Sequence, residues 1–380
     1  MAPATSLAIH RSRPSVLLGC LLLTACSFGD IYSTKKGPNL KAIESTVADR
    51  LISQHIPGAA LIIVKDGKLV DMKCFGYRDL SQMLPVTPVT PFCIGSCTKG
   101  FTVMAVEMAV DAGVVSLNDH PSKYLPEFKL KDPQFNNKVT LRDFISRRAE
   151  EDTKPLALDW NDTSPKKMLH VISGVRPHAN TSEQKLRNAN LNICVAGYAV
   201  AAASGTSYEK LIQDSIFRPL AMNDSRLSSD IRLAEDAHGH ILDKHAQPTR
   251  YERALDEIFQ PESGIVSSAR DMAKWLGLLT ADGVFEGKRL VSERGFNELF
   301  EPLLDSKSDF TSSLGWSEKT INGSRIVAHS GGAPGYCASI TILPDRHIGV
   351  VLLTNLGPES AEVQKAIPAW ILSQLVSTID

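Results

Sequence analysis

The chain has 380 residues, of which 43% are hydrophobic, and a formal net charge of −1, so it can bury a large core in one domain or in two intertwined ones. The near-neutral charge and the lack of a long basic run give no indication of nucleic acid or an anionic membrane surface as a partner. The composition is ordinary for a globular protein, and the sequence contains neither repeats nor low-complexity tracts.

Residues 1–26 have the pattern of a targeting segment. Arg11 and Arg13 precede an apolar run, Ser15 to Ala25, which is too short to span a bilayer. The run ends in Leu-Thr-Ala-Cys26, which resembles a bacterial lipobox. This resemblance implies cleavage before Cys26 and lipidation of that cysteine, which would anchor the protein in the cell envelope, on the periplasmic side of the outer membrane in a Gram-negative organism. A plain cleaved signal peptide is the alternative interpretation.

The segment that follows reads as a tether, and the folded domain is expected from residue 39 to residue 380. Residues 27–38 are rich in Ser, Gly, Lys and Pro, a composition typical of linkers. Residues 39–55 then place apolar side chains at helical spacing. Ala59 to Val64 and Leu69 to Phe75 predict two strands, and the Asp-Gly pair between them predicts a hairpin turn because both residues tolerate positive φ.

Ser96 and Lys99 form the first candidate catalytic pair. If a helix begins at or just before Ser96, the hydroxyl and the amine lie on the same face, three residues apart. A serine becomes a nucleophile when a neighbouring base takes its proton, and a lysine can be that base if burial and the helix N-terminus lower its pKa. The pair therefore indicates a serine nucleophile with a lysine base, the arrangement of penicillin-recognising enzymes.

The surroundings of Ser96 distinguish it from the other Ser-x-x-Lys copies, which lie in polar stretches: Ser33/Lys36, Ser164/Lys167, Ser182/Lys185 and Ser207/Lys210. Phe92 to Gly95 precede Ser96, and the run from Phe101 to Val110 contains Glu107 as its one charged residue, which predicts a largely buried helix. A serine that opens an apolar helix can also be a simple N-cap, so the local pattern leaves both interpretations open.

Residues from about 114 to 260 lose strand character and predict a helical subdomain. Strand patterns resume late in the chain, and residues 359–377 predict an amphipathic closing helix. The late strands are expected at Ser313–Ser317, Arg325–Ala328, Tyr336–Leu343 and Ile348–Thr354, with a turn at Asp345-Arg346. Strands at both ends of the chain predict an α/β (α+β) fold, in which an antiparallel sheet is flanked by terminal helices and carries a large all-helical insertion.

The seven cysteines do not form a disulfide framework. Cys20 would leave with the signal segment and Cys26 would be lipidated. The five that remain lie in apolar surroundings and are interpreted as small buried side chains: Cys74, Cys93, Cys97, Cys194 and Cys337. No Cys/His spacing in the sequence suggests a zinc site.

From about Ile56 to Leu356 the chain resembles the class C β-lactamase-like serine hydrolases, which include esterases, D-amino-acid peptidases and acyltransferases and are related to penicillin-binding proteins. The blocks that carry the resemblance occur in the family's order: Ile56-Pro-Gly-Ala-Ala60, Phe75-Gly-Tyr-Arg78, Tyr124-Leu-Pro-Glu127, Ile216-Phe-Arg-Pro-Leu-Ala-Met222 and Ser263 to Asp271. The resemblance implies the β-lactamase/transpeptidase-like fold and a cleft against the helical part.

The segment His329-Ser-Gly-Gly-Ala-Pro-Gly-Tyr336 resembles the family's third catalytic element, a strand edge beside the nucleophile. A carbonyl attacked by serine becomes an oxyanion, which needs two preorganised N–H donors. We expect these to be the N–H groups of Ser96 and Gly332, with Gly331 allowing the strand edge to approach the substrate closely. By the resemblance, His329 supplies polarity or positive charge near a substrate carboxylate or the leaving group.

The sequence departs from the family at two places. Where the family has Tyr-x-Asn, the chain has Asn188-Ala-Asn190, so Asn190 matches and Asn188 replaces the tyrosine that passes protons to the leaving group. An amide cannot carry that proton, and general acid–base assistance contributes about 10²–10⁴-fold. The second departure is Phe144 to Glu151, where relatives carry a glycine-containing turn at the cleft edge. Tyr198 and Tyr336 are weak substitutes for the missing tyrosine.

Two functions follow from the sequence. The first is a serine hydrolase acting through an acyl-enzyme on Ser96, with Lys99 as base, Asn190 as substrate ligand and His329 as electrostatic partner. Its substrate would be a small ester, amide or peptide, with simple esters favoured over β-lactams, and no cofactor is required because hydroxyl, amine and backbone donors suffice. The alternative is a catalytically impaired pseudoenzyme that serves as an envelope binding or scaffold protein. The sequence is silent on oligomeric state.

Overall fold

The first strand of the folded domain pairs with the last one, which joins the two ends of the chain in one sheet. The computed structural model describes residues 39–129, 137–146, 189–227, 234–251, 260–301, 310–321 and 323–379. The predicted signal segment with Cys26 and the predicted tether lie outside these residues. β1 (Gly58–Lys65) lies between β15 (Ile348–Thr354) and β2 (Lys68–Asp79), and both pairings are antiparallel.

The sheet has eight strands in the order β11-β12-β13-β14-β15-β1-β2-β3. The members not yet named are β3 (Leu84–Pro85), β11 (Phe310–Ser313), β12 (Trp316–Ile321), β13 (Ser324–Ala333) and β14 (Tyr336–Leu343). All neighbouring pairs in the sheet are antiparallel, as the sequence predicted. The strands predicted near both ends of the chain thus belong to one sheet, because the N-terminal β1 pairs with the C-terminal β15 in its middle.

Two turns show how local residues set the register. Asp66 and Gly67 have φ values of 49° and 73°, which confirms the predicted hairpin turn. The strand predicted at Ser313–Ser317 is instead the tip of a hairpin, because Gly315, with φ of 69°, reverses the chain between β11 and β12. The predicted turn at Asp345-Arg346 is confirmed as a 3-10 turn, Pro344–Arg346.

Both faces of the central strands are covered. In β1 the side chains of Ala60, Ile62 and Val64 belong to one buried cluster, and those of Ala59, Leu61 and Ile63 belong to another. Successive side chains of a strand point to opposite faces, so this alternation requires a layer on each side. Burial on both faces explains why the sequence of β1 is continuously apolar rather than alternating.

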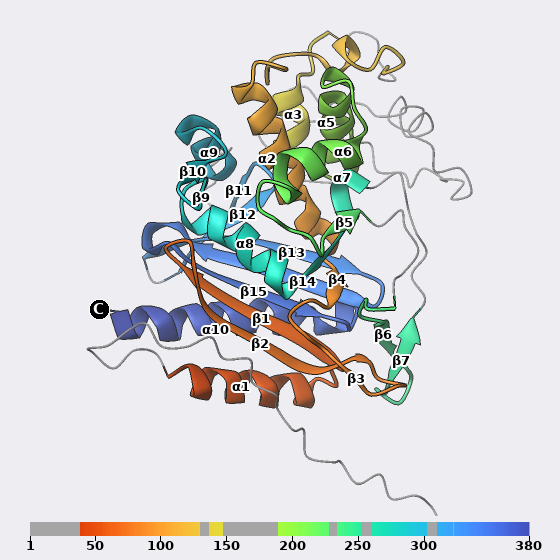
Figure 1. Ribbon diagram of the computed structural model, residues 1–380, viewed down its shortest axis with the longest axis vertical. Helices are drawn as coiled ribbons and strands as arrows, with labels where there is room; N and C mark the ends of the chain where they lie inside the picture. Colours follow the sequence, from red (N-terminus) through yellow and green to blue (C-terminus); the bar gives the residue numbers. More distant parts are fainter. Residues whose placement is uncertain are drawn as a thin grey trace, which may run out of the picture.

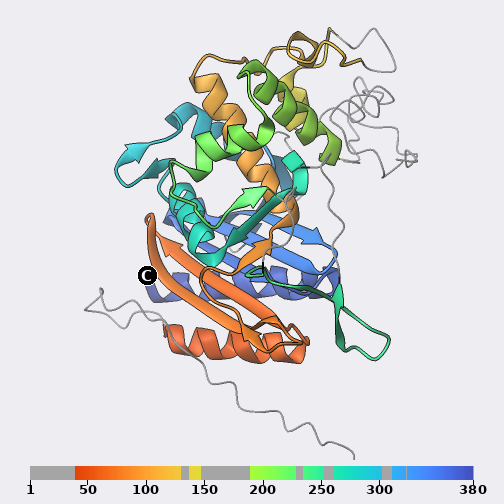
Figure 2. The ribbon, with the colours of Figure 1, turned by 45° about the vertical axis from the view of Figure 1, so that its right-hand side comes forward.

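The terminal helices α1 (Leu40–Ser53) and α10 (Ala361–Ile379) cover one face of the sheet, as predicted (Figure 1). On the opposite face, α8 (Ala269–Thr280) packs against β1 and β15. α2 (Thr98–Asp111) leads from that face into the helical part of the molecule (Figure 2). α2 therefore connects the sheet to the helical part of the molecule.

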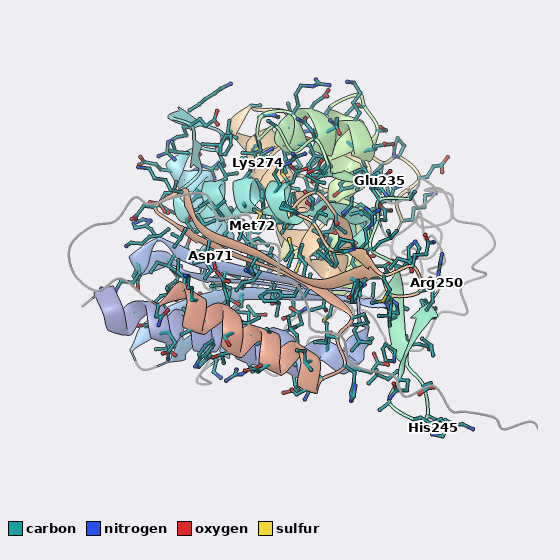
Figure 3. The ribbon with its side chains drawn as sticks, turned by 60° about the horizontal axis from the view of Figure 1, so that its bottom comes forward. Asp71, Met72, Glu235, His245, Arg250 and Lys274 are labelled. Atoms are coloured by element: carbon teal, nitrogen blue, oxygen red, sulfur yellow. The ribbon has the colours of Figure 1, made fainter. Side chains whose placement is uncertain are left out.

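The inserted part is mainly helical but also contains strands, which the sequence did not predict. Its helices are α3 (Leu141–Ile145), α5 (Ala189–Ala203), α6 (Tyr208–Ile212), a following π-helical turn (Gln213–Phe217) and α7 (Gln260–Ser263). Its strands are β5 (Arg226–Leu227) and the hairpin of β6 (Gly239–Leu242) and β7 (Pro248–Tyr251). The hairpin projects from the body of the protein, with His245 at its tip (Figure 3). These strands were missed because each is too short to show an alternating pattern.

The remaining elements complete the packing around α2. β4 (Pro91–Cys93) pairs with β8 (Ile265–Ser268), which also pairs with β5. β9 (Val284–Phe285) and β10 (Lys288–Arg289) form a small hairpin before α9 (Glu293–Phe300). The cysteines at positions 93, 97, 194 and 337 are buried and form no disulfide, as the sequence indicated, whereas Cys74 is partly exposed. Burial raises the pKa of the Cys97 thiol, so this side chain packs rather than reacts.

Candidate active site

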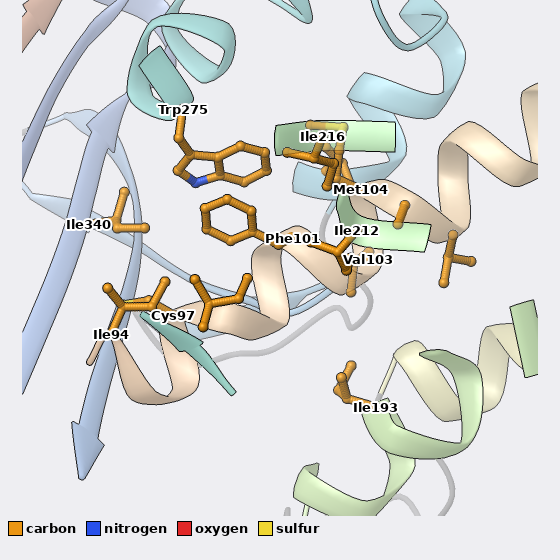
Figure 4. Close-up of a cluster of buried hydrophobic side chains, with 14 of the residues drawn as sticks. Ile94, Cys97, Phe101, Val103, Met104, Ile193, Ile212, Ile216, Trp275 and Ile340 are labelled. Atoms are coloured by element: carbon orange, nitrogen blue, oxygen red, sulfur yellow. The ribbon is translucent and has the colours of Figure 1, made fainter. Parts of the chain in front are cut away.

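Ser96 lies in a tight turn at the start of a buried helix. Gly95 has a φ of 48°, and the 3-10 turn η1 (Gly95–Cys97) runs directly into α2. The predicted burial of this helix is confirmed: Phe101 is fully buried and stacks on Trp275 of α8 at a ring-centroid distance of 3.8 Å (Figure 4). Apolar packing therefore fixes the helix that presents Ser96.

Ser96 and Lys99 meet as the spacing predicted. Lys99 Nζ donates to Ser96 Oγ at 2.7 Å, and Lys99 is only 2% exposed. The copy at Ser207/Lys210 has a different role, because Ser207 caps α6 by accepting from the Lys210 backbone N–H at 3.1 Å. A buried amine on a serine hydroxyl is unusual, and it makes the Ser96 copy the candidate for a chemical role.

The third member of the site is Glu262, which the sequence reasoning did not identify. Ser96 Oγ donates to Glu262 Oε1 at 2.5 Å, and Lys99 Nζ donates to the same oxygen at 2.5 Å. Burial would raise the pKa of Glu262, but the Lys99 ammonium and hydrogen bonds from Lys99, Ser96 and Ser263 lower it below its usual value. Glu262 is therefore a buried carboxylate held in its charged form.

A signal for Glu262 was present in the sequence. A buried lysine needs a counter-charge, and Glu262 is the acidic residue directly before the block Ser263 to Asp271, which the family resemblance had already placed in the domain. The sequence could not show that Glu262 lies next to Lys99, because the two residues are separated by 163 positions along the chain. Only the packing of α7 on α2 brings them together.

The backbone around Glu262 is held by several contacts. The Pro261 carbonyl accepts from Thr102 Oγ1 at 2.6 Å, and the Ile265 N–H donates to Thr98 Oγ1 at 3.2 Å. Both threonines are in α2, the helix that carries Lys99. Gly197 of α5 lies against Pro261, where an added Cβ would come within 2.8 Å of the proline ring. These contacts fix the carboxylate relative to the serine and the lysine.

Strand β13 passes directly beside the nucleophile turn. A Cβ on Gly331 would lie 2.0 Å from the Ile94 carbonyl oxygen and 2.9 Å from the Ser96 nitrogen. The ladder between β12 and β13 ends at the pair Ser317–Ala328, so β13 continues from His329 to Ala333 beyond that pairing. A Cβ on Gly332 would meet nothing within 4 Å. Gly331 thus permits close approach to the serine turn, whereas Gly332 faces open space.

His329 lies on the same face of β13 as Gly331. Its backbone carbonyl accepts from the Cys97 thiol at 3.6 Å, and its ring contacts Trp316 edge-on at 6.2 Å between centroids. The side chain is 7% exposed. The histidine therefore belongs to the wall of the nucleophile turn, and its role toward a substrate stays a prediction.

Some predicted residues cannot be placed by their side chains. Asn188 lies outside the described residues, and Asn190 belongs to α5 by its backbone alone. The two tyrosines considered as substitutes for the family tyrosine have packing contacts. Tyr336 donates to the Ala237 carbonyl at 2.9 Å, and the Tyr198 ring packs on Tyr208 at 5.9 Å. The described part of the chain thus offers Glu262, not a tyrosine, beside Ser96 and Lys99.

Clusters of metal-ligating side chains and helices able to span a membrane are both absent from the described ranges. Within them, no group of three or more His, Cys, Asp or Glu side chains is placed to hold a metal ion. No helix among the same residues is long and apolar enough to cross a bilayer.

Known proteins resemble this chain over most of its length. The Beta-lactamase family model matches residues 43–374. Beta-lactamase of Escherichia coli (strain K12) is 26% identical over 385 aligned positions, which cover 91% of this chain and 96% of the relative. Protein flp of Staphylococcus aureus (strain NCTC 8325 / PS 47) is 26% identical over 321 positions, which cover 83% of this chain. The chain spans 63% of the length of Protein flp.

A solved structure agrees with the architecture. The octameric penicillin-binding protein homologue from Pyrococcus abyssi superposes with a TM-score of 0.76 at 24% identity, covering 90% of this chain and 78% of the homologue. At this level of identity the similarity concerns the fold. The family resemblance and the β-lactamase/transpeptidase-like fold expected from the sequence are both confirmed.

Proposed function

The chain belongs to the beta-lactamase family, and from this premise we propose that it is a serine hydrolase that acts through an acyl-enzyme on Ser96. The observation that carries the proposal is the 2.7 Å hydrogen bond from the buried Lys99 amine to the Ser96 hydroxyl. The ion pair with Glu262 offsets the cost of burying this amine. Its further contact with a hydroxyl at the start of a helix is what such a pair does not need, and it favours a catalytic role.

The proposed reaction begins with attack of Ser96 Oγ on a substrate carbonyl. The backbone N–H groups of Ser96 and Gly332 are the proposed oxyanion donors, and the close packing of Gly331 on the Ser96 turn supports this assignment. Asn190 is proposed to bind the substrate and His329 to interact with the leaving group. Water then hydrolyses the acyl-enzyme.

The base has to be a group that can accept a proton. Lys99 was the base in the sequence-based hypothesis, and a lysine accepts a proton only in its neutral form. Its 2.5 Å ion pair with Glu262 favours the ammonium form. In that form Lys99 stabilises negative charge on the Ser96 oxygen.

We expect small esters with good leaving groups to react faster than amides or β-lactams. The physical reason is Asn188, whose amide cannot protonate a leaving group where the family has a tyrosine. Nitrophenolate, the leaving group of a nitrophenyl ester, departs without being protonated, whereas an amine leaving group needs a proton. Equal or greater turnover of a cephalosporin than of a nitrophenyl ester would refute this order.

The function is tested by exposing the mature protein to a fluorophosphonate probe and measuring its intact mass. A single adduct that maps to Ser96 and is lost in Ser96→Ala is the expected result. A folded protein without an adduct at high probe concentration would support the alternative, a pseudoenzyme with a binding or scaffold role in the envelope. That alternative draws on the replacement of the family tyrosine by Asn188.

The proposed location is the bacterial cell envelope, through a lipid on Cys26. Leu23-Thr24-Ala25-Cys26 supports this proposal as a lipobox-like sequence. Expression of the full chain in a bacterium with labelled palmitate should label the wild-type protein and leave Cys26→Ala unlabelled and released from membranes. Labelling of both proteins, or of neither, would contradict the anchor.

A further inference from the structure

One carboxylate oxygen receives hydrogen bonds from both the nucleophile and the lysine. Ser96 Oγ and Lys99 Nζ each lie 2.5 Å from Glu262 Oε1, and they are 2.7 Å from each other. An ammonium has donors and no acceptor, so both of its hydrogen bonds are donated. The Ser96 hydroxyl has one hydrogen, and among the described residues the acceptor to which it donates is the carboxylate. The hydroxyl proton is therefore directed at Glu262.

We propose that Glu262, rather than Lys99, is the proton acceptor when Ser96 attacks, and that Lys99 remains an ammonium throughout. This inference rests on the proposed serine hydrolase function and assigns a catalytic residue to it. Glu262 contacts the reacting oxygen directly. Lys99 stabilises the negative charge that develops on that oxygen and keeps the carboxylate ionised.

The proton and electron pairs balance without another reactant. As the Ser96 O–H bond breaks, the proton moves to Glu262 Oε1 and the oxygen forms a bond to the substrate carbonyl carbon, whose π electrons move to the carbonyl oxygen. When the carbonyl re-forms, the bond to the leaving group breaks and Glu262 returns its proton to that group. In deacylation, water gives a proton to Glu262 as it attacks, and the carboxyl group then protonates Ser96 as the acyl bond breaks.

An ion pair alone does not account for this geometry. A carboxylate that served only as the counter-charge of Lys99 would need no contact with Ser96, yet the two oxygens are 2.5 Å apart. The carboxylate is also held in place through its neighbours, since Pro261 is bound by Thr102. Glu262 further supplies a proton-transferring group to a site in which Asn188 stands at the position of the family tyrosine, so the preference for esters with good leaving groups becomes smaller to the extent that Glu262 protonates the leaving group.

The charges near Glu262 make the two assignments distinguishable by pH. The elements that pack most extensively against α7 are η1, α2 and α5. Their titratable side chains within the described residues are Cys97, Lys99, Glu107, Asp111, Cys194 and Tyr198. Lys99 is the one that forms an ion pair with Glu262. Because this pairing lowers the pKa of Glu262, a carboxylate base stays active in mildly acidic solution, where a lysine base is protonated.

The test is the rate at which a fluorophosphonate labels Ser96, measured from about pH 4 to pH 9 on protein shown to be folded at each pH by circular dichroism. Fluoride leaves without protonation, so this probe isolates the acceptance of the serine proton. If Glu262 is the acceptor, the wild-type rate stays level down to about pH 5 and falls only near or below the ordinary glutamate value of about 4.3. This profile needs no variant and is independent of folding defects.

Glu262→Gln is the matching variant, because it keeps the shape and removes the acceptor. We expect its labelling rate to fall by about 10²–10⁴-fold at every pH. The control is Glu318→Gln, which removes a carboxylate that pairs with Arg325 at 2.7 Å, away from Ser96, and should label within about twofold of wild type. Glu262→Asp should recover part of the lost rate because it restores a carboxylate at a longer distance.

Two results would contradict the role of Glu262 as proton acceptor. If Lys99 is the base, the wild-type rate declines below neutral pH, and Glu262→Gln labels as fast or faster because Lys99 has lost the partner that keeps it protonated. Either result would overturn the role of Glu262 while leaving the hydrolase intact. Failure of the hydrolase proposal looks different: folded wild-type protein would show no Ser96 adduct at any pH, and both proposals would be withdrawn.

Discussion

Gly331→Ala should both destabilise the protein and slow the reaction of Ser96. A Cβ at this position would lie 2.0 Å from the Ile94 carbonyl oxygen, and real Cβ contacts keep at least 3.0 Å. The two backbones would therefore have to separate by about 1 Å, and such overpacking costs about 1–3 kcal/mol. Both neighbours are backbone atoms in a fixed turn, so no side-chain rotation can relieve the contact.

The neighbouring glycine supplies the control. A Cβ on Gly332 would meet nothing within 4 Å, so Gly332→Ala should leave stability unchanged or raise it slightly by restricting the unfolded chain. Thermal unfolding should show Gly331→Ala several degrees below Gly332→Ala, at about 2–4 °C per kcal/mol for domains of 150–250 residues.

Reactivity provides a second measurement of the same displacement. The added carbon on Gly331 would also come within 2.9 Å of the Ser96 nitrogen, so the serine turn shifts with the strand. Fluorophosphonate labelling of Ser96 in Gly331→Ala should therefore be slower than in wild type. Equal melting temperatures for the two alanine variants would show that β13 does not need a residue without a side chain at position 331 to pack against the nucleophile turn.

Two further predictions concern buried charged groups, and a third concerns a helix cap. Burial, followed by the charge of Glu298, raises the pKa of Glu107 to about 8. The free energy of unfolding should therefore fall as pH rises from about 4.5 to 8, by at most about 1.4 kcal/mol per pH unit. Urea unfolding at a series of pH values should show that Glu107→Gln removes this decline. Lys99→Met leaves Glu262 buried without its ion pair and should lower the free energy of unfolding by about 3–5 kcal/mol at pH 7. The loss should be smaller at pH 4, where the carboxyl group takes up a proton. The double variant Lys99→Met/Glu262→Gln should recover part of the lost stability. Ser292→Ala removes the N-cap of α9, an Oγ that accepts from the Gly295 N–H at 3.0 Å, and should lower the free energy of unfolding by about 1 kcal/mol; an unchanged midpoint would contradict the cap.

Much of the secondary structure could be predicted from local sequence patterns. The Asp66-Gly67 turn, the strands on either side of it and the apolar helix after Ser96 are all short-range features, in which neighbouring residues set the backbone. The all-helical interpretation of the insertion missed β5, β6 and β7 because two- to four-residue strands depend on their partners, not on their own pattern.

The sequence by itself determined the fold class, the family and the pairing of Ser96 with Lys99, because these rest on periodicity, turn chemistry and a spacing of three residues along one helix. Tertiary structure alone decided that Glu262 is the third group, and that Gly331 packs on the serine turn while Gly332 faces open space. The physical reason is that hydrogen bonds and close contacts act over about 3 Å, whereas Glu262 and Gly331 are far from Ser96 along the chain. Such distances are fixed only when α7 and β13 pack around the start of α2.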